Sequence, residues 1–151
     1  MTQIRVTRES PVTPDGHGLI NGSEAALREV YTADECFTFT ADELVSDNVS
    51  FFVARQSGQA LGCVALVNQT AYGEIKRLYV PQAARGLGVA KILMAHLEAQ
   101  ARAQDLPCVK LETGSKLAAA VALYKTLGYS VCAKFGLYKD HPASLFMEKA
   151  L

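Results

Sequence analysis

The chain of 151 residues lacks tryptophan, has only three histidines, and has no excess of charge, since fifteen basic and fifteen acidic residues cancel. A balanced charge speaks against general affinity for nucleic acid or for an anionic membrane, so we expect neither as a partner. The histidines and the four cysteines are scattered, without C-x-x-C or H-x-x-x-H spacing. No metal site is therefore predicted, and the cysteines are expected to be reduced thiols.

Long hydrophobic runs are also absent. No stretch approaches the roughly 20 apolar residues that a transmembrane helix needs. Residues 1–10 (MTQIRVTRES) lack the apolar segment of a secretory signal, so we expect a cytoplasmic protein. Half of the residues are hydrophobic, and a chain of this length can bury its own core, so residues 1–151 are predicted to form a single domain.

The N-terminal third of the chain has the weakest pattern. Residues 3–8 alternate between polar and apolar and predict a strand. Residues 10–21 contain prolines and glycines and predict a loop with at most a short helix. Ser23 is predicted to cap a helix that follows it, and the capping box formed by Thr40 and Glu43 predicts another short helix. The aromatic residues of this region are interpreted as core packing rather than as substrate contacts; they are Tyr31, Phe37 and Phe39.

The rest of the chain has a clearer periodicity. Three β-rich runs joined by short turns, from residue 50 to residue 80, predict an antiparallel meander, because parallel neighbours need a longer crossover. A helix over residues 89–104 then leads to a strand at 108–113, which such a crossover can place parallel to the preceding strand. A second helix is predicted from Thr113 or Ser115 to Gly128, followed by two last strands. The fold class is α+β: a mixed, mostly antiparallel sheet of about seven strands flanked by helices.

A glycine-rich loop separates the third strand of the meander from the long helix. Small residues let backbone N–H groups approach a ligand, and the positive end of the helix dipole favours an anion there. This pattern predicts phosphate binding, with a plain tight connection as the alternative. No Gly-Lys-Ser/Thr follows, which excludes a P-loop. The loop residues are Arg85, Gly86, Leu87, Gly88, Val89 and Ala90.

Four segments in this order, EIKRLYV, RGLGVA, LETG and ALYKTLGY, resemble the GNAT superfamily of acetyl-CoA-dependent N-acetyltransferases. The loop matches the superfamily signature Arg/Gln-x-x-Gly-x-Gly/Ala, and Leu123-Tyr124 to Gly128-Tyr129 matches its LY-x-x-x-GY signature. The resemblance is strong over residues 50–133 and weak at the closing strand. It implies a GNAT-like fold, acetyl-CoA as the co-substrate without a metal, and an amine acceptor.

The resemblance also implies roles for the donor-binding residues. Residues 85–90 would bind the pyrophosphate of coenzyme A through their backbone N–H groups, with the charge of Arg85 nearby. The end of the preceding strand would separate from its neighbour and bind the pantetheine arm through its backbone. That strand end consists of Leu78, Tyr79 and Val80.

Two residues are predicted to move protons. Glu74 is the candidate base, with a surface charge pair to Lys76 as the alternative. Tyr124 is the candidate acid that protonates the departing thiolate, with simple packing as the alternative. Because adjacent strand residues point to opposite faces, at most one of Lys76 and Arg77 is expected to face the cleft, where it would favour a carboxylate-bearing acceptor.

One position departs from the family pattern. Where many members carry an asparagine that contacts pantetheine, this chain has Leu117, and Thr113 or Ser115 could replace that contact. The segment at residues 135–142 resembles the variable hairpin before the last strand. Its aromatic residues and His141 either line the acceptor pocket or are simply exposed.

The leading hypothesis is an N-acetyltransferase that acts on a small-molecule, amino-acid or peptide amine by direct attack in a ternary complex. The alternatives are a catalytically degenerate acetyl-CoA-binding sensor or interaction module, and an acyltransferase that uses a longer acyl-CoA. The sequence leaves open the identity of the amine and whether the chain forms a homodimer.

Overall fold

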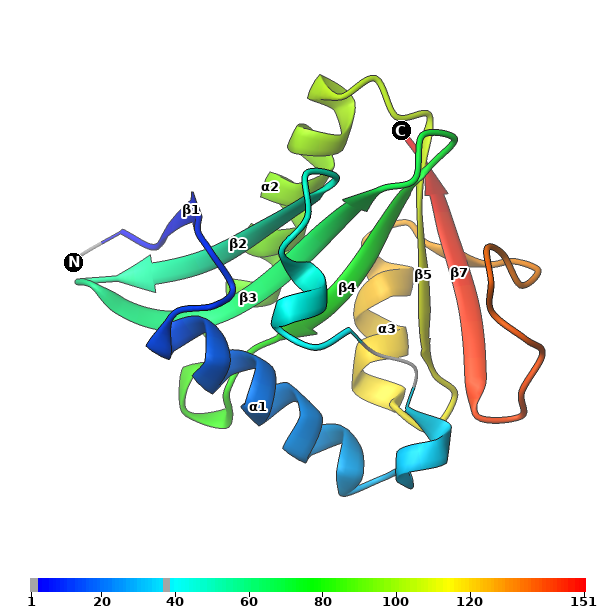
Figure 1. The fold of residues 1–151 in the computed structure, drawn as a ribbon, viewed down its shortest axis with the longest axis horizontal. Coiled ribbons are helices and arrows are strands. Elements are labelled where there is room, and N and C mark those ends of the chain that lie inside the picture. Colours follow the sequence, from blue (N-terminus) through cyan, green and yellow to red (C-terminus); the bar gives the residue numbers. More distant parts are fainter. Residues whose placement is uncertain (1–2, 37–38) are drawn as a thin grey trace.

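The computed structural model describes residues 3–36 and 39–151, which form a mixed seven-stranded sheet with helices on both faces (Figure 1). The strand order is β1-β2-β3-β4-β5-β7-β6, and the β4–β5 pair is parallel while the other pairs are antiparallel. This architecture confirms the predicted fold class. The strands are β1 (Arg5–Arg8), β2 (Val49–Gln56), β3 (Gln59–Asn68), β4 (Gly73–Tyr79), β5 (Cys108–Gly114), β6 (Ser130–Val131) and β7 (Ser144–Ala150).

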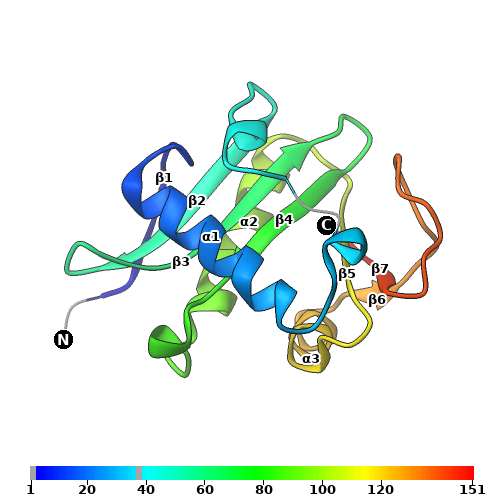
Figure 2. The ribbon, with the colours of Figure 1, turned by 60° about the horizontal axis from the view of Figure 1, so that its bottom comes forward.

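The helices divide between the two faces of the sheet (Figure 2). Helix α1 (Pro14–Arg28) crosses one face, while α2 (Val89–Ala103) and α3 (Ala118–Thr126) cover the other. Successive side chains of a strand point to opposite faces of the sheet. The apolar ones therefore form two buried clusters, one against each helical layer, with the sheet between them. Short 3-10 turns occur at Ala33–Glu35, Asp42–Leu44 and Gln82–Ala84. No helix in the described ranges is both long enough and apolar enough to cross a membrane.

Helix α1 shows that the prediction of a loop at residues 10–21 was wrong. The side chain of Thr13 accepts a hydrogen bond from the N–H of Gly16, and Pro14 occupies the first turn. Ser23, predicted to cap the helix, is instead buried in its interior. Glycine is required early in α1, because a Cβ at Gly16 would lie 2.2 Å from the carbonyl oxygen of Pro11. Packing therefore outweighs the low helix propensity that argued for a loop.

The capping box at Thr40 is confirmed by its two reciprocal hydrogen bonds. The N–H of Glu43 donates to Thr40 Oγ1 at 3.2 Å, and the N–H of Thr40 donates to Glu43 Oε1 at 3.0 Å. Thr32 and Glu35 form a second capping box that the sequence reading missed. Both boxes open only 3-10 turns. The interpretation of Phe37 lies outside the described residues.

Helix α3 begins later than predicted. Its N-cap is Leu117 rather than Thr113 or Ser115, because β5 continues to Gly114 in register with Ser144 of β7. The meander β2–β3–β4, the α2 crossover and the last two strands agree with the predicted pattern.

Strands β4 and β5 pair over only a short length and then diverge (Figure 1). The ladder joins Gly73–Ile75 to Val109–Leu111 and stops there, although both strands continue. In β4 the register against β3 shifts near Arg77, which has a φ of 54°. A left-handed conformation at a residue other than glycine costs on the order of 1–3 kcal/mol and is typical of functional sites. The sheet therefore opens at its centre.

Candidate active site between β4 and β5

A cavity of about 210 Å³ occupies the opening between β4 and β5. Residues from both strands line it, together with side chains from α1 on one face and α3 on the other. An opening in the sheet is what allows side chains from opposite layers to meet in one cavity. The lining residues that carry the chemistry discussed below are Lys76, Arg77, Leu78, Tyr79, Glu112, Thr113 and Tyr124.

The glycine-rich loop follows the open end of β4. Gly86 and Gly88 have φ values of 86° and 76°, and a Cβ at either would meet no heavy atom within 4 Å. Gly88 is the N-cap of α2 and supplies no side-chain cap. Within the described chain, none of the N–H groups from Gly86 to Lys91 donates a hydrogen bond. A row of free N–H groups at the start of a 15-residue helix is suited to a phosphate anion.

The other predicted donor-binding residues lie where β4 meets this loop. Leu78 and Tyr79 line the cavity, and Val80 follows directly. Arg85 is exposed, and its Nε donates to the carbonyl oxygen of Val80 at 3.2 Å. The guanidinium of Arg85 therefore lies beside the end of β4, and its role at the pyrophosphate stays a prediction.

Tyr124 reaches the same cavity from α3 and is 7% exposed. Burial raises the pKa of its hydroxyl, and the charge of Glu112 adds to this effect. Its ring packs edge-on against Tyr129 at 5.8 Å between centroids. Tyr124 therefore keeps its proton at neutral pH and lines the cavity.

Glu112 is the residue that the sequence reading missed. It stands in the LETG segment on β5 and lines the cavity with Tyr124. No residue in ranges 3–36 and 39–151 forms a hydrogen bond or ion pair with its carboxylate, and burial raises its pKa to about 7. The nearby charge of Lys76 lowers that pKa, and that of Glu74 raises it. The sequence carried no clear signal for this role, because Glu112 alternates with the buried positions of β5 just as Lys110 does.

Glu74 lies at the start of β4 and is 3% exposed. Its Oε2 accepts a hydrogen bond from the Tyr138 hydroxyl at 2.7 Å and lies 3.0 Å from Lys76 Nζ. Gln69 donates weakly to Oε1 at 3.4 Å. The charge pair with Lys76 that the sequence offered as an alternative therefore exists, but it is buried rather than on the surface.

Lys76 and Arg77 both line the cavity, so the expectation that at most one could face the cleft was wrong. The irregular backbone at Arg77 breaks the alternation of strand side chains. Arg77 bonds to the Phe39 carbonyl oxygen at 3.0 Å, to Ser23 Oγ at 3.2 Å and to Glu24 at 2.9 Å. Through these bonds it ties α1 and the segment before residue 40 to β4.

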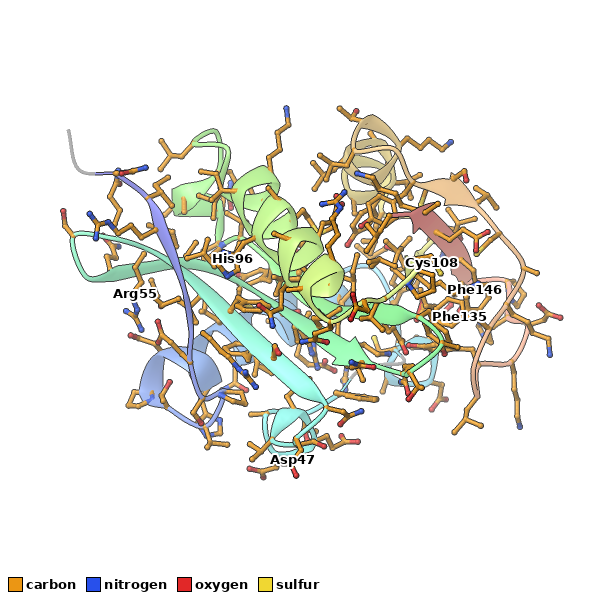
Figure 3. All side chains as sticks on the ribbon, turned by 90° about the horizontal axis from the view of Figure 1, so that it is seen from above. Asp47, Arg55, His96, Cys108, Phe135 and Phe146 are labelled. Atoms are coloured by element: carbon orange, nitrogen blue, oxygen red, sulfur yellow. The ribbon has the colours of Figure 1, made fainter. Side chains whose placement is uncertain are left out.

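A second cavity of about 390 Å³ adjoins the first, and Lys76 and Cys36 line both. It is rich in aromatic side chains and is closed on one side by the hairpin before β7. Phe135 of that hairpin packs on Phe146 of β7, with ring centroids 5.6 Å apart. Figure 3 shows these two rings side by side, far from Arg55. The second cavity is lined by Cys36, Phe39, Glu43, Gln69, Tyr72, Glu74, Lys76, Gly136, Leu137 and Tyr138.

The two aromatic residues near α1 that the structure describes lie at these cavities rather than only in the core. Tyr31 is buried and lines the first cavity, and its hydroxyl accepts a hydrogen bond from the N–H of Lys116 at 2.7 Å. Phe39 lines the second. His141 lines neither, and its Nδ1 accepts a hydrogen bond from the N–H of Ala143.

The position that departs from the family pattern lies at the first cavity. Leu117 lines it, and so does Thr113, whereas Ser115 donates to the carbonyl oxygen of Pro142 at 3.3 Å. Thr113 is therefore the better placed of the two candidate replacements. In the described chain no group of three His, Cys, Asp or Glu residues could hold a metal ion, and the cysteines are free thiols.

Comparison with known proteins gives consistent matches. The sequence profile of the Acetyltransferase (GNAT) family matches residues 18–129. The chain is 36% identical over the full length of both chains to an IAA acetyltransferase of Azospirillum brasilense. A crystal structure from Klebsiella pneumoniae, described as an acyl-CoA N-acyltransferase, superimposes with a TM-score of 0.83 at 32% identity, covering 99% of this chain and 98% of that one. The PaiA N-acetyltransferase of Thermoplasma acidophilum, solved with coenzyme A, has the same fold, with a TM-score of 0.80 at 14% identity over 99% of each chain.

Proposed function

The chain belongs to the acetyltransferase (GNAT) family, and on that premise we propose that it transfers an acetyl group from acetyl-CoA to a primary amine. One observation carries the proposal. A loop of free backbone N–H groups follows β4, and β4 lines a cavity that brings together a half-buried carboxylate, Glu112, and a buried tyrosine, Tyr124. Anion binding next to a proton acceptor and a proton donor is what acyl transfer from a coenzyme A thioester requires.

The donor fits the open half of the site. The N–H groups of residues 86–91 would hold the pyrophosphate, and Arg85 would add positive charge beside it. The free edge of β4 at Leu78–Val80 would bind the pantetheine arm as an added strand. Acetyl is the proposed acyl group because the relative from Azospirillum brasilense is named an acetyltransferase.

The chemistry needs two protons to leave the ammonium and one to reach the sulfur. The ammonium first loses one proton, because only the neutral amine is nucleophilic. Its nitrogen then forms a bond to the thioester carbonyl carbon, and the carbon–sulfur bond breaks as Tyr124 donates its hydroxyl proton to the departing thiolate. The nitrogen loses a second proton, which restores the Tyr124 hydroxyl through solvent, and the products are the N-acetyl amine and coenzyme A.

We propose Glu112 as the proton acceptor in preference to Glu74, the base predicted from sequence. The Oε2 of Glu74 already accepts a hydrogen bond from Tyr138 and pairs with Lys76, so it is engaged within the protein rather than turned to a substrate. Glu112 has no such partners in the described chain, and its pKa of about 7 suits proton transfer near neutral pH. Glu74 would then hold Lys76 and Tyr138 in place.

Direct attack by the amine is favoured over an acetyl-enzyme intermediate. Cys36 is the cysteine that lines both cavities, and its Sγ donates a hydrogen bond to the carbonyl oxygen of Thr32. Burial raises the pKa of the Cys36 thiol, which disfavours the nucleophilic thiolate. The two adjoining cavities instead allow both substrates to be bound at once.

The test is a panel of amines incubated with acetyl-CoA, with free thiol measured continuously and the products identified by mass. The panel includes arylalkylamines, alkyl diamines, amino acids, peptides and IAA, the last because a relative carries that name. We expect thiol release that depends on the amine and equals the amount of N-acetyl product. Tight binding of acetyl-CoA without release for any acceptor would instead support a sensor or interaction module.

A further inference from the structure

The positive charges that face the two cavities are already neutralised. Lys76 lies 3.0 Å from Glu74, donates a hydrogen bond to the Tyr138 hydroxyl and is 8% exposed. Arg77 pairs with Glu24 at 2.9 Å, and the exposure of its side chain is 4%. No other lysine or arginine lines either cavity in the described chain. A carboxylate on the acceptor would therefore find no cation available to bind it.

Negative charge, in contrast, exceeds positive charge among the residues that line the cavities, although the charges of Lys116 and His141 act on Glu35 and those of Arg77 and Lys76 on Glu43. Glu35 lines the first cavity and Glu43 the second, and neither forms an ion pair with a lysine or arginine of the described chain. Hydrogen bonds from the backbone N–H groups of Thr32 and Thr40 lower the pKa of these two carboxyls, so both are ionised at neutral pH. With Glu112 they make three carboxylates around a site whose cations are paired.

Aromatic rings form much of the second cavity. Phe39 and Tyr138 enclose Lys76, whose Nζ lies 4.7 and 4.6 Å from their ring centroids. Tyr72 adds a third ring, packed against Phe135. Such walls accommodate an apolar or aromatic group.

From this balance we infer that the acceptor is a cationic amine on an apolar or aromatic body, with no carboxylate beside the amine, an inference that rests on the proposed function. The carboxylates attract the ammonium, the rings hold the body, and the paired Lys76 and Arg77 leave an acceptor carboxylate without a partner. The carboxylate-bearing acceptor suggested by these two cations in the sequence is therefore disfavoured.

The experiment compares acceptors that differ only beside the amine. Phenethylamine, phenylalaninamide and phenylalanine share one ring, and cadaverine and lysine form an aliphatic pair. We expect kcat/KM for phenethylamine and phenylalaninamide to exceed that for phenylalanine by about tenfold or more, with the same order for cadaverine over lysine. The amide separates the effect of charge from that of size.

A charge-removing variant shows where the preference arises. The double variant Glu35→Gln with Glu43→Gln keeps both capping boxes, since glutamine also serves in that motif. Its KM for the preferred amine should rise about threefold to tenfold at low salt, with an unchanged KM for acetyl-CoA. The matched control is Asp34→Asn with Asp42→Asn, which removes two exposed charges from the same turns but outside both cavities. An equal KM for the preferred amine in the two double variants would contradict the inference.

The outcomes for function and specificity are separable. Acetylation that is as efficient for phenylalanine or lysine as for the matched amine overturns the inference and leaves the proposed function intact. Thiol release from none of the acceptors, while acetyl-CoA binds, contradicts the proposed function and the inference with it.

Discussion

The donor half and the acceptor half of the site are built in different ways. The donor half consists of backbone: the free edge of β4 and the N–H groups from Gly86 to Lys91 come from one continuous segment. The acceptor half consists of side chains from several segments, of which Phe39, Glu74 and Tyr138 are examples. In the function that we propose, backbone groups bind what all coenzyme A thioesters share, while side chains select the amine. The donor half should therefore be sensitive to conformation, and the acceptor half to charge and shape.

The largest effect is expected at the junction of the two halves. Tyr124→Phe removes the proposed proton donor, so kcat should fall about 100-fold to 1000-fold. The Kd for acetyl-CoA should not change, because neither the loop nor the β4 edge is altered. Stopped-flow thiol release and calorimetric titration measure the two quantities. Full activity in this variant would remove Tyr124 from the mechanism.

Glu112→Gln should reduce kcat/KM about 100-fold and also change its pH profile. A base must be deprotonated, so the wild-type activity should rise with pH through about 7, the pKa of Glu112. That rise should be absent in the variant. Glu74→Gln is the matched comparison. We expect this variant to keep the rise in activity near pH 7 and to lose less kcat/KM than Glu112→Gln. If the rise near pH 7 instead disappeared in Glu74→Gln and stayed in Glu112→Gln, Glu74 would be the base, as predicted from the sequence.

In the donor half, Gly88→Ala should raise the Kd for acetyl-CoA about tenfold, because a Cβ disfavours the left-handed conformation that aims the N–H groups. The control is Gly58→Ala in the β2–β3 turn, where φ is 81° and the space is equally open. Both variants carry similar backbone strain. Thermal unfolding should show similar destabilisation, and only Gly88→Ala should bind acetyl-CoA more weakly.

The smallest effect is expected for Arg85→Gln. The side chain is exposed, so its contribution is screened and the Kd for acetyl-CoA should rise only about threefold, at low salt. The control is Arg102→Gln, which removes a positive charge from the last turn of α2, at the opposite end of that helix from the loop. A loss of binding that persists at high salt would mean that Arg85 contacts the donor more closely than we propose.

The strand, loop and helix of the proposed donor half could be predicted from the sequence because they depend on local rules, whereas the roles of their residues came from the family resemblance and stay predictions. Glycines with positive φ, a strand before them and a helix after them are all properties of neighbouring residues. The paired strands and the parallel crossover followed in the same way from turn and loop lengths. These features accounted for the fold class.

The acceptor half could not be predicted because it depends on contacts between distant residues. The alternation rule placed Lys76 and Arg77 on opposite faces, and the backbone irregularity at Arg77 brought both to the cavity. Glu74 was predicted to be the base, with a charge pair to Lys76 as the alternative, and nothing in the sequence indicated that Tyr138 reaches it from 64 residues away. The start of α1 is a separate case. Thr13 and Pro14 are a cap and a first-turn residue typical of a helix start, but the prolines and glycines of residues 10–21 led to the prediction of a loop.

The central claim is that both halves are occupied at once and that the amine attacks the thioester directly. The most direct test is the initial rate of thiol release, measured while acetyl-CoA and the preferred amine are varied together. The account predicts double-reciprocal lines that intersect, as for a ternary complex. Parallel lines, with an acetyl group found on Cys36 by mass spectrometry, would contradict it.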